Sequence, residues 1–361
     1  MKRIILSGYY GFKNAGDEAI LAALIDNLKR VIKDIEIIVL SADPEWTENT
    51  YNVSSINRVG IRRLISYLKE SDLLISGGGS LLQDVSSNRS IPYYLGVIVI
   101  AKLLKVPVFF CAQGVGPIKK SFNRKMIKKI LNKLELITVR DKDSKSLLKS
   151  IGVKKKIYLT ADPVFTLNKT NRSRIKEILK KEGICCRTGM LGVSLRPWQD
   201  NHYLKEIAKV LDQVKEVLGV KILFLPLHYP QDLEVSKEVE ALMKEEVEII
   251  EGSYTPKEIL SLIGEVDMLL GVRLHSLIFA SLNRVAIAGI SYDPKIDSFL
   301  DQLDLSPIGT IEKLDSQQLL KQIVEIWEQK EDLIKRIDKK VKNLEGLAKQ
   351  NIELSLRLLG D

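Results

Sequence analysis

The sequence has few of the residues that build disulfide frameworks or metal sites. It contains three cysteines and three histidines in 361 residues. Cys111, Cys185 and Cys186 are too few and too irregularly spaced for a disulfide framework or a zinc site. Cys111 follows the apolar residues 108–110, so we expect it to act as a small buried hydrophobe. No group of histidine, cysteine and acidic residues has metal-ligand spacing, so we expect no metal site.

Long apolar runs and two common nucleotide-binding motifs are also missing. The most apolar window, residues 91–104, is too short to span a bilayer, and the N-terminus has no apolar core of a signal peptide. The loop at residues 8–18 differs from the dinucleotide fingerprint G-x-G-x-x-G. The triple glycine at residues 77–79 lacks the Gly-Lys-Ser/Thr end of a P-loop. We therefore predict a cytoplasmic protein and disfavour a dinucleotide or nucleoside triphosphate site.

Positive charge is in excess and unevenly distributed. The net charge is +9, and the stretch 119–156 holds fourteen Lys or Arg residues against Glu135, Asp141 and Asp143. This balance predicts an anionic partner: nucleic acid, a phosphorylated metabolite or an anionic membrane surface. Phe122 is the only aromatic residue in this stretch, which argues against nucleic acid.

One segment of this stretch has the periodicity of an amphipathic helix. Its apolar face is formed by Ile127, Ile130, Leu131 and Leu134, and its other faces carry Lys125, Lys128, Lys129 and Lys133. We expect the apolar face to pack on a sheet and the lysines to point outward. An outward basic face either attracts anionic lipid or only keeps the protein soluble, and the sequence leaves both open.

Short apolar runs alternate with helical segments along the chain, which predicts parallel sheets covered on both faces. We place a boundary at the polar segment 168–174, giving an N-terminal domain of residues 1–167 and a C-terminal domain of residues 168–361. The predicted fold class is α/β, with two doubly wound Rossmann-like domains that face a cleft and bind ligand at the carboxyl ends of the strands. The expected strands are residues 3–6, 35–40, 72–75, 106–112, 136–139, 157–159, 191–195, 221–225, 247–250, 267–270 and 285–290.

A long amphipathic helix is expected near the C-terminus. From Leu320 onward, apolar residues recur at helical spacing among many charges. This helix either packs across both domains or binds a partner as a coiled coil.

Arginine and histidine follow three expected strands of the C-terminal half. Arg273 and His275 stand where residues 266–270 give way to a helix, and the N-terminus of a helix favours an anion. Arg196 and His228 end two other strands. An arginine fork suits a carboxylate or phosphate, and a histidine can transfer a proton near neutral pH. We expect these side chains to converge on one small anion; the alternative is a structural arginine beside a core histidine.

Glycine-rich loops follow the strands of the N-terminal half. Gly77, Gly78 and Gly79 let the backbone approach a ligand, and Gln83 or Asp84 could bind sugar hydroxyls. The segment 113–117 repeats this design after the next strand. Asp17 lies near a helix start, where it either caps the helix or acts in the site.

Together these motifs resemble the polysaccharide pyruvyl transferase family, and within it the CsaB type that modifies cell-wall polysaccharide for S-layer anchoring. The resemblance implies a glycosyltransferase-B-like fold with phosphoenolpyruvate as co-substrate and no other cofactor. It implies transfer of a pyruvyl ketal onto two hydroxyls of a sugar, commonly an N-acetylmannosamine of a lipid-linked precursor. The matching segments are Asn14–Ala19, Ser76–Ser80, Gln113–Pro117, Ser194–Arg196, Pro226–His228 and Arg273–Ser276.

The resemblance also implies a division of labour between the domains. Family proteins place arginines and an Arg-Leu-His unit at phosphoenolpyruvate, so the C-terminal domain would bind the donor through Arg196, His228, Arg273, Leu274, His275 and Ser276. The N-terminal domain would bind a lipid-linked or nucleotide-linked amino-sugar acceptor through Asp17, Gly77, Gly78, Gly79, Ser80, Gln83, Asp84, Gln113 and Gly114.

Our hypothesis for catalysis assigns two of these residues to the reaction itself. His275 would protonate the methylene carbon as general acid, and Arg273, with Arg196, would favour departure of phosphate. His228 or Asp17 would be the base for a sugar hydroxyl. Such an enzyme would work in the cytoplasm or at the inner face of the plasma membrane, where its lipid-linked substrate lies.

Two other functions stay open. A nucleotide-sugar glycosyltransferase of the same two-domain shape would release nucleoside diphosphate instead of phosphate. A basic nucleic-acid-binding protein would leave the glycine loops unexplained.

Overall fold

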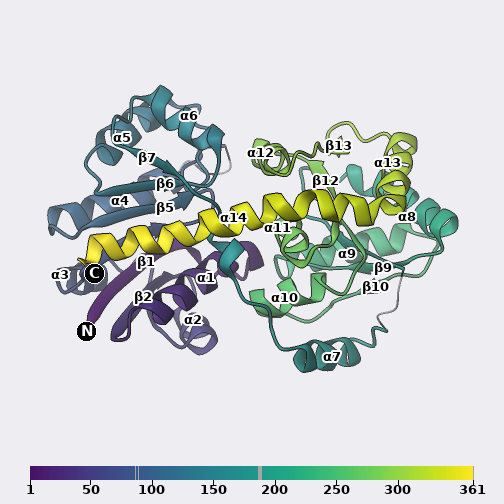
Figure 1. The fold of residues 1–361 in the computed structure, drawn as a ribbon, viewed down its shortest axis with the longest axis horizontal. Helices are drawn as coiled ribbons and strands as arrows, with labels where there is room; N and C mark the ends of the chain where they lie inside the picture. Colours follow the sequence, from purple (N-terminus) through teal and green to yellow (C-terminus); the bar gives the residue numbers. More distant parts are fainter. Residues whose placement is uncertain (86, 88, 186–188, 361) are drawn as a thin grey trace. The chain divides into compact units, whose positions relative to one another are not determined.

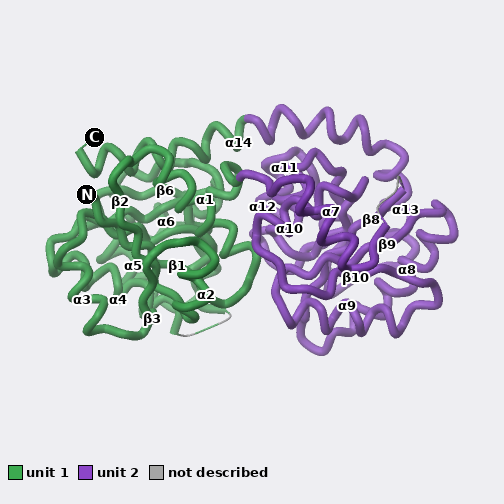
Figure 2. The backbone as a smooth tube through the Cα atoms, turned by 90° about the horizontal axis from the view of Figure 1, so that it is seen from below, with its two compact units in different colours: residues 1–167, 343–361 green, residues 168–342 purple. Residues whose placement is uncertain are grey.

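The computed structural model describes residues 1–85, 87, 89–185 and 189–360, so Cys186 lies outside the described residues. Two compact units make up the chain (Figure 2). Unit 1 consists of residues 1–167 and 343–361, and unit 2 consists of residues 168–342. The end of the terminal helix, which we had assigned to the second domain, therefore groups with unit 1.

Unit 1 contains a seven-stranded parallel sheet in the order β3-β2-β1-β4-β5-β6-β7 (Figure 1). The edge strand β3 was not predicted, because Ser54, Ser55 and Asn57 give it no apolar run. The strands are β1 (Lys2–Tyr10), β2 (Ile35–Ser41), β3 (Ser54–Asn57), β4 (Leu73–Gly77), β5 (Val108–Gln113), β6 (Leu136–Val139) and β7 (Ile157–Leu159).

Unit 2 contains a six-stranded parallel sheet in the order β10-β9-β8-β11-β12-β13. Its three central strands, β8, β11 and β12, are buried from end to end, as continuous apolar runs predict. The two-residue edge strand β13 was missed, because a strand that short has no periodicity. The strands are β8 (Met190–Ser194), β9 (Lys221–Phe224), β10 (Glu248–Ile249), β11 (Met268–Gly271), β12 (Ala286–Ser291) and β13 (Gly309–Thr310).

Helices lie on both faces of each sheet (Figure 1), so the predicted α/β, doubly wound architecture is confirmed. Those of unit 1 are α1 (Ala15–Val31), α2 (Pro44–Tyr51), α3 (Ile61–Lys69), α4 (Ser90–Leu103), α5 (Ser121–Leu131) and α6 (Lys142–Ile151). Those that begin in unit 2 are α7 (Arg172–Lys181), α8 (Tyr203–Leu218), α9 (Gln231–Leu242), α10 (Pro256–Ile263), α11 (Leu274–Asn283), α12 (Pro294–Gln302), α13 (Ser316–Glu328) and α14 (Lys330–Leu359).

The expected terminal helix is two helices, because the chain leaves helical geometry at Gln329 between α13 and α14. The amphipathic pattern itself is confirmed: Ile337, Val341 and Leu344 are buried. Within unit 1, the buried Asn351 of α14 accepts hydrogen bonds from the hydroxyls of Thr138 and Thr160, each at 2.9 Å. A buried amide is stable only with such partners, so these bonds fix the end of the helix on the unit 1 sheet.

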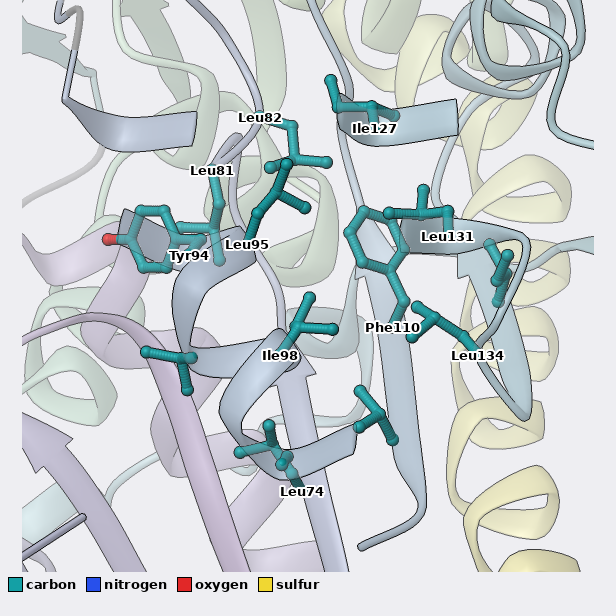
Figure 3. Packing of buried hydrophobic residues seen from close by; sticks show 14 of the residues in the cluster. Leu74, Leu81, Leu82, Tyr94, Leu95, Ile98, Phe110, Ile127, Leu131 and Leu134 are labelled. Atoms are coloured by element: carbon teal, nitrogen blue, oxygen red, sulfur yellow. The ribbon is translucent and has the colours of Figure 1, made fainter. Parts of the chain in front are cut away.

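One large apolar cluster lies between the unit 1 sheet and helices α4 and α5 (Figure 3). Phe110 of β5 packs there with Ile127 and Leu131 of α5. The lysines at positions 125, 128, 129 and 133 are exposed, so the predicted orientation of this helix is confirmed. Cys111 is buried as a free thiol, and burial raises its pKa, as expected for a small core residue.

Candidate active site

In unit 2, four adjacent strands end beside one another, and a functional side chain follows each. The order β9-β8-β11-β12 places His228, Arg196, Arg273 and Tyr292 just past the ends of these strands. Carboxyl ends of parallel strands share one edge of the sheet, which is where ligands of such folds bind. Three of these residues were predicted for the site, and Tyr292 was not.

Arg273 is held by a carboxylate that the sequence analysis did not single out. Its Nε and Nη2 atoms donate to the two oxygens of Asp232, a residue of α9 that is only 1% exposed. Asp232 also accepts the backbone N–H groups of Leu227, at 3.2 Å, and His228, at 2.9 Å. Burial works against the charge on Arg273, but Asp232 outweighs it and the pKa of Arg273 is raised. The guanidinium therefore stays charged. Its Nε and Nη2 donors are already bonded to Asp232.

Arg196 lies against two aromatic rings. Its Cζ atom is 4.2 Å from the ring centroid of Tyr292 and 5.4 Å from that of Trp198, and the two rings are 4.8 Å apart. The Tyr203 hydroxyl donates to the Arg196 carbonyl at 2.5 Å and accepts its N–H at 3.3 Å. The Arg196 Nε atom donates to the Pro197 carbonyl at 3.3 Å, and this bond and the stacking together hold the guanidinium near the end of β8.

Tyr292 and Lys295 complete a cationic cluster. The Lys295 Nζ atom is 5.2 Å from the Tyr292 ring centroid and 3.5 Å from the Asp293 carboxylate. Burial alone would raise the pKa of Tyr292, but Lys295, Arg196 and Arg273 lower it, and the net shift is downward. Three cations around one phenol make this edge of the sheet suited to an anion. The sequence signal was weak: a tyrosine and a lysine after the last long strand.

His275 lies in the first turn of α11, after Arg273 at the N-cap. Its side chain is half-buried, and its ring centroid is 6.4 Å from that of Phe279. Ser276 is fully buried and donates its hydroxyl to the Arg273 carbonyl at 2.7 Å, and Leu274 is also buried. Those two neighbours support the loop, whereas His275 lies at the helix start, two residues after Arg273 of the cationic cluster.

Unit 1 brings the two predicted glycine loops together. The N–H of Gly114 donates to the Gly79 carbonyl at 2.9 Å. Ser80 accepts at 3.0 Å from Arg140, which follows β6 and is paired at 2.7 Å with Asp162. Arg140 lies at the end of an apolar strand, the same signal that identified Arg196, but it was not singled out.

The triple glycine packs tightly on α1. Gly78 has a φ of +62°, and a Cβ there would lie 2.0 Å from Ile20; the equivalent atom at Gly79 would lie 2.7 Å from an oxygen of Asp17. Only glycine suits these positions. The loop therefore brings the Asp17 carboxylate next to Gly79 and Ser80.

Two other predicted acceptor residues are used within the fold. Gln113 is fully buried and donates to the carbonyl of Ser76 at 2.9 Å. Asp84 accepts from the backbone N–H groups of Lys119 and Lys120, and these bonds overcome the effect of burial and lower its pKa. Gln83 beside it is half-buried. Contact of these residues with a sugar stays a prediction.

Glu18, next to Asp17, is an unusual carboxylate. It is 1% exposed, accepts from the N–H of Gly11 at 2.7 Å, and accepts from the Tyr51 hydroxyl at 2.9 Å. Burial, with a smaller contribution from Asp17, raises its pKa to about 7 despite these hydrogen bonds. The described residues hold no group of three His, Cys, Asp or Glu side chains that could bind a metal ion.

A family model described as polysaccharide pyruvyl transferase matches residues 14–294. The chain belongs to the polysaccharide pyruvyl transferase family. The matched range includes both glycine loops and the cluster as far as Asp293, and Lys295 lies just beyond it. No curated protein sequence matches the chain.

Solved structures resemble this chain in fold. The Staphylococcus aureus MnaA–UDP structure has a TM-score of 0.69 at 14% identity and covers 100% of this chain and 98% of its own. Anabaena HepE with UDP-glucose has a TM-score of 0.65 at 14% identity and covers 99% and 100%. The UDP-GlcNAc 2-epimerase of Methanocaldococcus jannaschii has a TM-score of 0.64 at 16% identity and covers both chains fully. At these identities the likeness establishes the glycosyltransferase-B-like fold.

Proposed function

We propose that the protein transfers a pyruvyl group from phosphoenolpyruvate onto two hydroxyls of a sugar, forming a ketal and releasing phosphate. The cationic cluster of Arg196, Arg273 and Lys295 beside His275 carries the proposal. Phosphoenolpyruvate bears a carboxylate and a phosphate on neighbouring atoms, and several cations at a helix start suit that charge. Family membership supports the same reaction type.

The proposed reaction uses two proton transfers. The first sugar hydroxyl bonds to C2 of phosphoenolpyruvate while His275, as general acid, protonates the methylene carbon to a methyl group. The second hydroxyl then bonds to C2 as the C2–O bond to phosphate breaks, and its electron pair leaves with phosphate. The two hydroxyl protons end on the methyl carbon and on phosphate. Arg196 and Arg273 stabilise the charge on the departing group.

We propose that unit 2 binds the donor and unit 1 binds the acceptor sugar. Asp17 and Ser80 at the unit 1 loops, where Asp162 compensates the charge of Arg140, suit hydroxyls better than a trianion. His228 or Asp17 would be the base for the attacking hydroxyl. Arg196→Ala should raise the KM for phosphoenolpyruvate and Ser80→Ala the KM for acceptor; the opposite pattern would reverse the assignment.

The acceptor we propose is an amino sugar, N-acetylmannosamine, carried on a lipid or a nucleotide in cell-wall polysaccharide synthesis for S-layer anchoring. Structures of similar fold were determined with UDP and with UDP-glucose, which supports a nucleotide-linked sugar as an alternative carrier to lipid. The proposed place of work is the cytoplasm, with peripheral attachment at the inner face of the plasma membrane through the exposed lysines of α5. None of the described helices has the length and apolar character to cross a membrane.

The decisive experiment incubates the protein with phosphoenolpyruvate and candidate precursors, with phosphate measured and products weighed by mass spectrometry. We expect phosphate release and a product heavier by one pyruvyl group. Release of nucleoside diphosphate from a nucleotide sugar, without consumption of phosphoenolpyruvate, would instead establish a glycosyltransferase. Salt-dependent binding to random DNA, tighter than to any sugar precursor, would favour the nucleic-acid alternative.

A further inference from the structure

Tyr292 is a half-buried phenol that the reaction above does not use. Its ring packs against Trp198, with centroids 4.8 Å apart at an angle of 57°, and against the guanidinium of Arg196. Aromatic stacking needs only the ring, and phenylalanine would supply it equally well. The hydroxyl interacts with Lys295, and because an ammonium group can only donate, the phenol keeps its own proton for transfer.

The groups around Tyr292 leave positive charge in excess. Three cations act on it, from three different parts of unit 2: Arg196 after β8, Arg273 at the N-cap of α11, and Lys295 in the first turn of α12. Two of them have acidic partners, since Asp232 pairs with Arg273 and Asp293 with Lys295.

Arg196 has no carboxylate within salt-bridge distance among the described residues, so the cluster keeps a net positive charge. Tyr203 of α8 lies against its main chain with a raised pKa, so it stays neutral. His228 and His275 also lie at this edge of the sheet, and the exposed Asp297 of α12 accepts a hydrogen bond from the Ser291 hydroxyl at 2.6 Å. A phenolate formed at Tyr292 would therefore be stabilised, and the pKa of Tyr292 is lowered although partial burial works against the charged form.

A second observation places unused donors in the same cluster. The indole Nε1 of Trp198 and the hydroxyl of Ser194 are buried and have no hydrogen-bond partner in the part of the chain that the structure describes. Buried donors are almost always bonded in native proteins, so these two are available to a polar ligand. Ser194 is the last residue of β8, and the Trp198 ring lies against Arg196. Arg196 in turn contacts the Tyr292 ring.

We propose that the Tyr292 hydroxyl is the proton donor to phosphate as it leaves. The step rests on the proposed pyruvyl transfer. The C2–O bond breaks and its electron pair goes to the bridging oxygen, which takes the proton from Tyr292. Phosphate then departs as a dianion rather than as the far more basic trianion. The phenolate, stabilised by the three cations, regains a proton from the second sugar hydroxyl as that oxygen bonds to C2.

Tyr292→Phe tests the step, because it removes the O–H and keeps the ring against Arg196. We expect turnover to fall ~10²–10⁴-fold, as for loss of a general acid. The KM for phosphoenolpyruvate should change little, and the fall in rate at high pH that reports a titrating phenol should disappear. Tyr254→Phe is the matched control, since Tyr254 bonds to Glu182 away from the cluster. It should keep parental turnover.

An ultraviolet titration of tyrosinate gives a readout that does not depend on activity. The parent minus Tyr292→Phe difference should show one phenol that ionises below its ordinary value of 10. The parent minus Tyr254→Phe difference should show one that ionises above it, because burial and Glu182 raise the pKa of Tyr254.

Three results would overturn the step. They are parental turnover in Tyr292→Phe, a loss of turnover with an unchanged pH profile, and a Tyr292 that ionises above its ordinary value. A parent protein that releases no phosphate from phosphoenolpyruvate overturns the proposed function and the step with it. An active parent whose Tyr292→Phe variant is equally active overturns the step alone.

Discussion

The two sheets are built alike, but their carboxyl edges carry different charge. In unit 2, Arg196, Arg273 and Lys295 surround one phenol, and their charge exceeds that of the neighbouring carboxylates. In unit 1, Arg140 is paired with Asp162. Topology brings the loops of each sheet to one edge, and the few residues that follow each strand decide what that edge can bind.

The difference also lies in how buried charge is balanced. Unit 1 adds carboxylates, Asp17 and Glu18, beside its glycine loop, where burial holds the pKa of Glu18 at about 7. Unit 2 has cations whose N–H donors are only partly used by acidic partners. An edge of the first kind suits neutral hydroxyls, and one of the second kind suits an anion, which agrees with the proposed division between acceptor and donor.

The largest effect is expected from removing His275, the proposed proton donor to the methylene carbon. His275→Ala should lower turnover ~10²–10⁴-fold while phosphoenolpyruvate still binds, since a general acid acts on the reaction rather than on affinity. Steady-state kinetics and direct binding measurements would separate the two. His202→Ala is the matched control, because His202 is exposed and pairs with Asp200. Near-parental turnover in His275→Ala would remove this histidine from the mechanism.

The next effect compares the buried ion pairs of the two units. Arg273→Ala leaves Asp232 buried without its partner, which should cost about 3–5 kcal/mol of unfolding free energy and weaken phosphoenolpyruvate binding. Arg140→Ala should cost a similar stability, because Asp162 is 3% exposed, but donor binding should persist. Denaturant unfolding and calorimetric binding give the two readouts.

A double variant, Arg273→Ala with Asp232→Ala, separates stability from binding. It should recover stability, because no unpaired charge is left, without recovering donor affinity. Recovery of both would show that Arg273 has only a structural role. Loss of donor binding in Arg140→Ala would show that the two edges are not specialised as proposed.

Glu18 sharpens the comparison through pH. Its folded pKa of about 7 exceeds the ordinary 4.5, so the folded state holds this proton more tightly than the unfolded state. The stability that the folded state gains from protonated Glu18 is complete below pH 4.5 and is lost as pH rises through about 7. The free energy of unfolding should fall by about 3 kcal/mol over this range. Glu18→Gln should remove this dependence, so its melting temperature should exceed that of the parent at pH 8 and match it at pH 4.5. An equal slope in both proteins would contradict the raised pKa.

The smallest effect concerns the outward face of α5. Reversing Lys125, Lys129 and Lys133 to Glu should reduce binding to anionic vesicles by about 1 kcal/mol or more for each residue, and turnover on a soluble acceptor should not change. Sedimentation with vesicles at low and high salt measures this, with neutral vesicles as control. Equal sedimentation of variant and parent would show that α5 is not a docking face.

Much of the architecture could be predicted because it depends on local pattern. Long apolar strands such as β1, β5 and β12 are visible as continuous runs, and the helical face of Ile127 and Leu131 was predicted with the correct side buried. The short polar strand β3 and the two-residue β13 were missed, since pairing with a neighbour and not their own composition makes them strands.

The candidate site was predictable only where a residue type is unusual at its position. Arg273 and His275 stand out at a strand end, but Asp232 looks like an ordinary helix-start acid. Its role depends on Arg273, 41 positions away in the chain, and no local pattern links the two. For the same reason, the partners that Gln113 and Asp84 have inside the fold could not be predicted, and contact of these residues with a ligand stays a prediction.

The sequence by itself determined the α/β class, the alternation of strands and helices, and the edge at which Arg196, Arg273 and His275 would lie. These follow from hydrophobic periodicity and from the geometry of parallel sheets. Only the tertiary structure decided which charges are compensated: Arg273 by Asp232, Arg140 by Asp162, and Tyr292 set among three cations. Electrostatic interactions depend on distance and burial across the fold, and neither can be read from the order of residues.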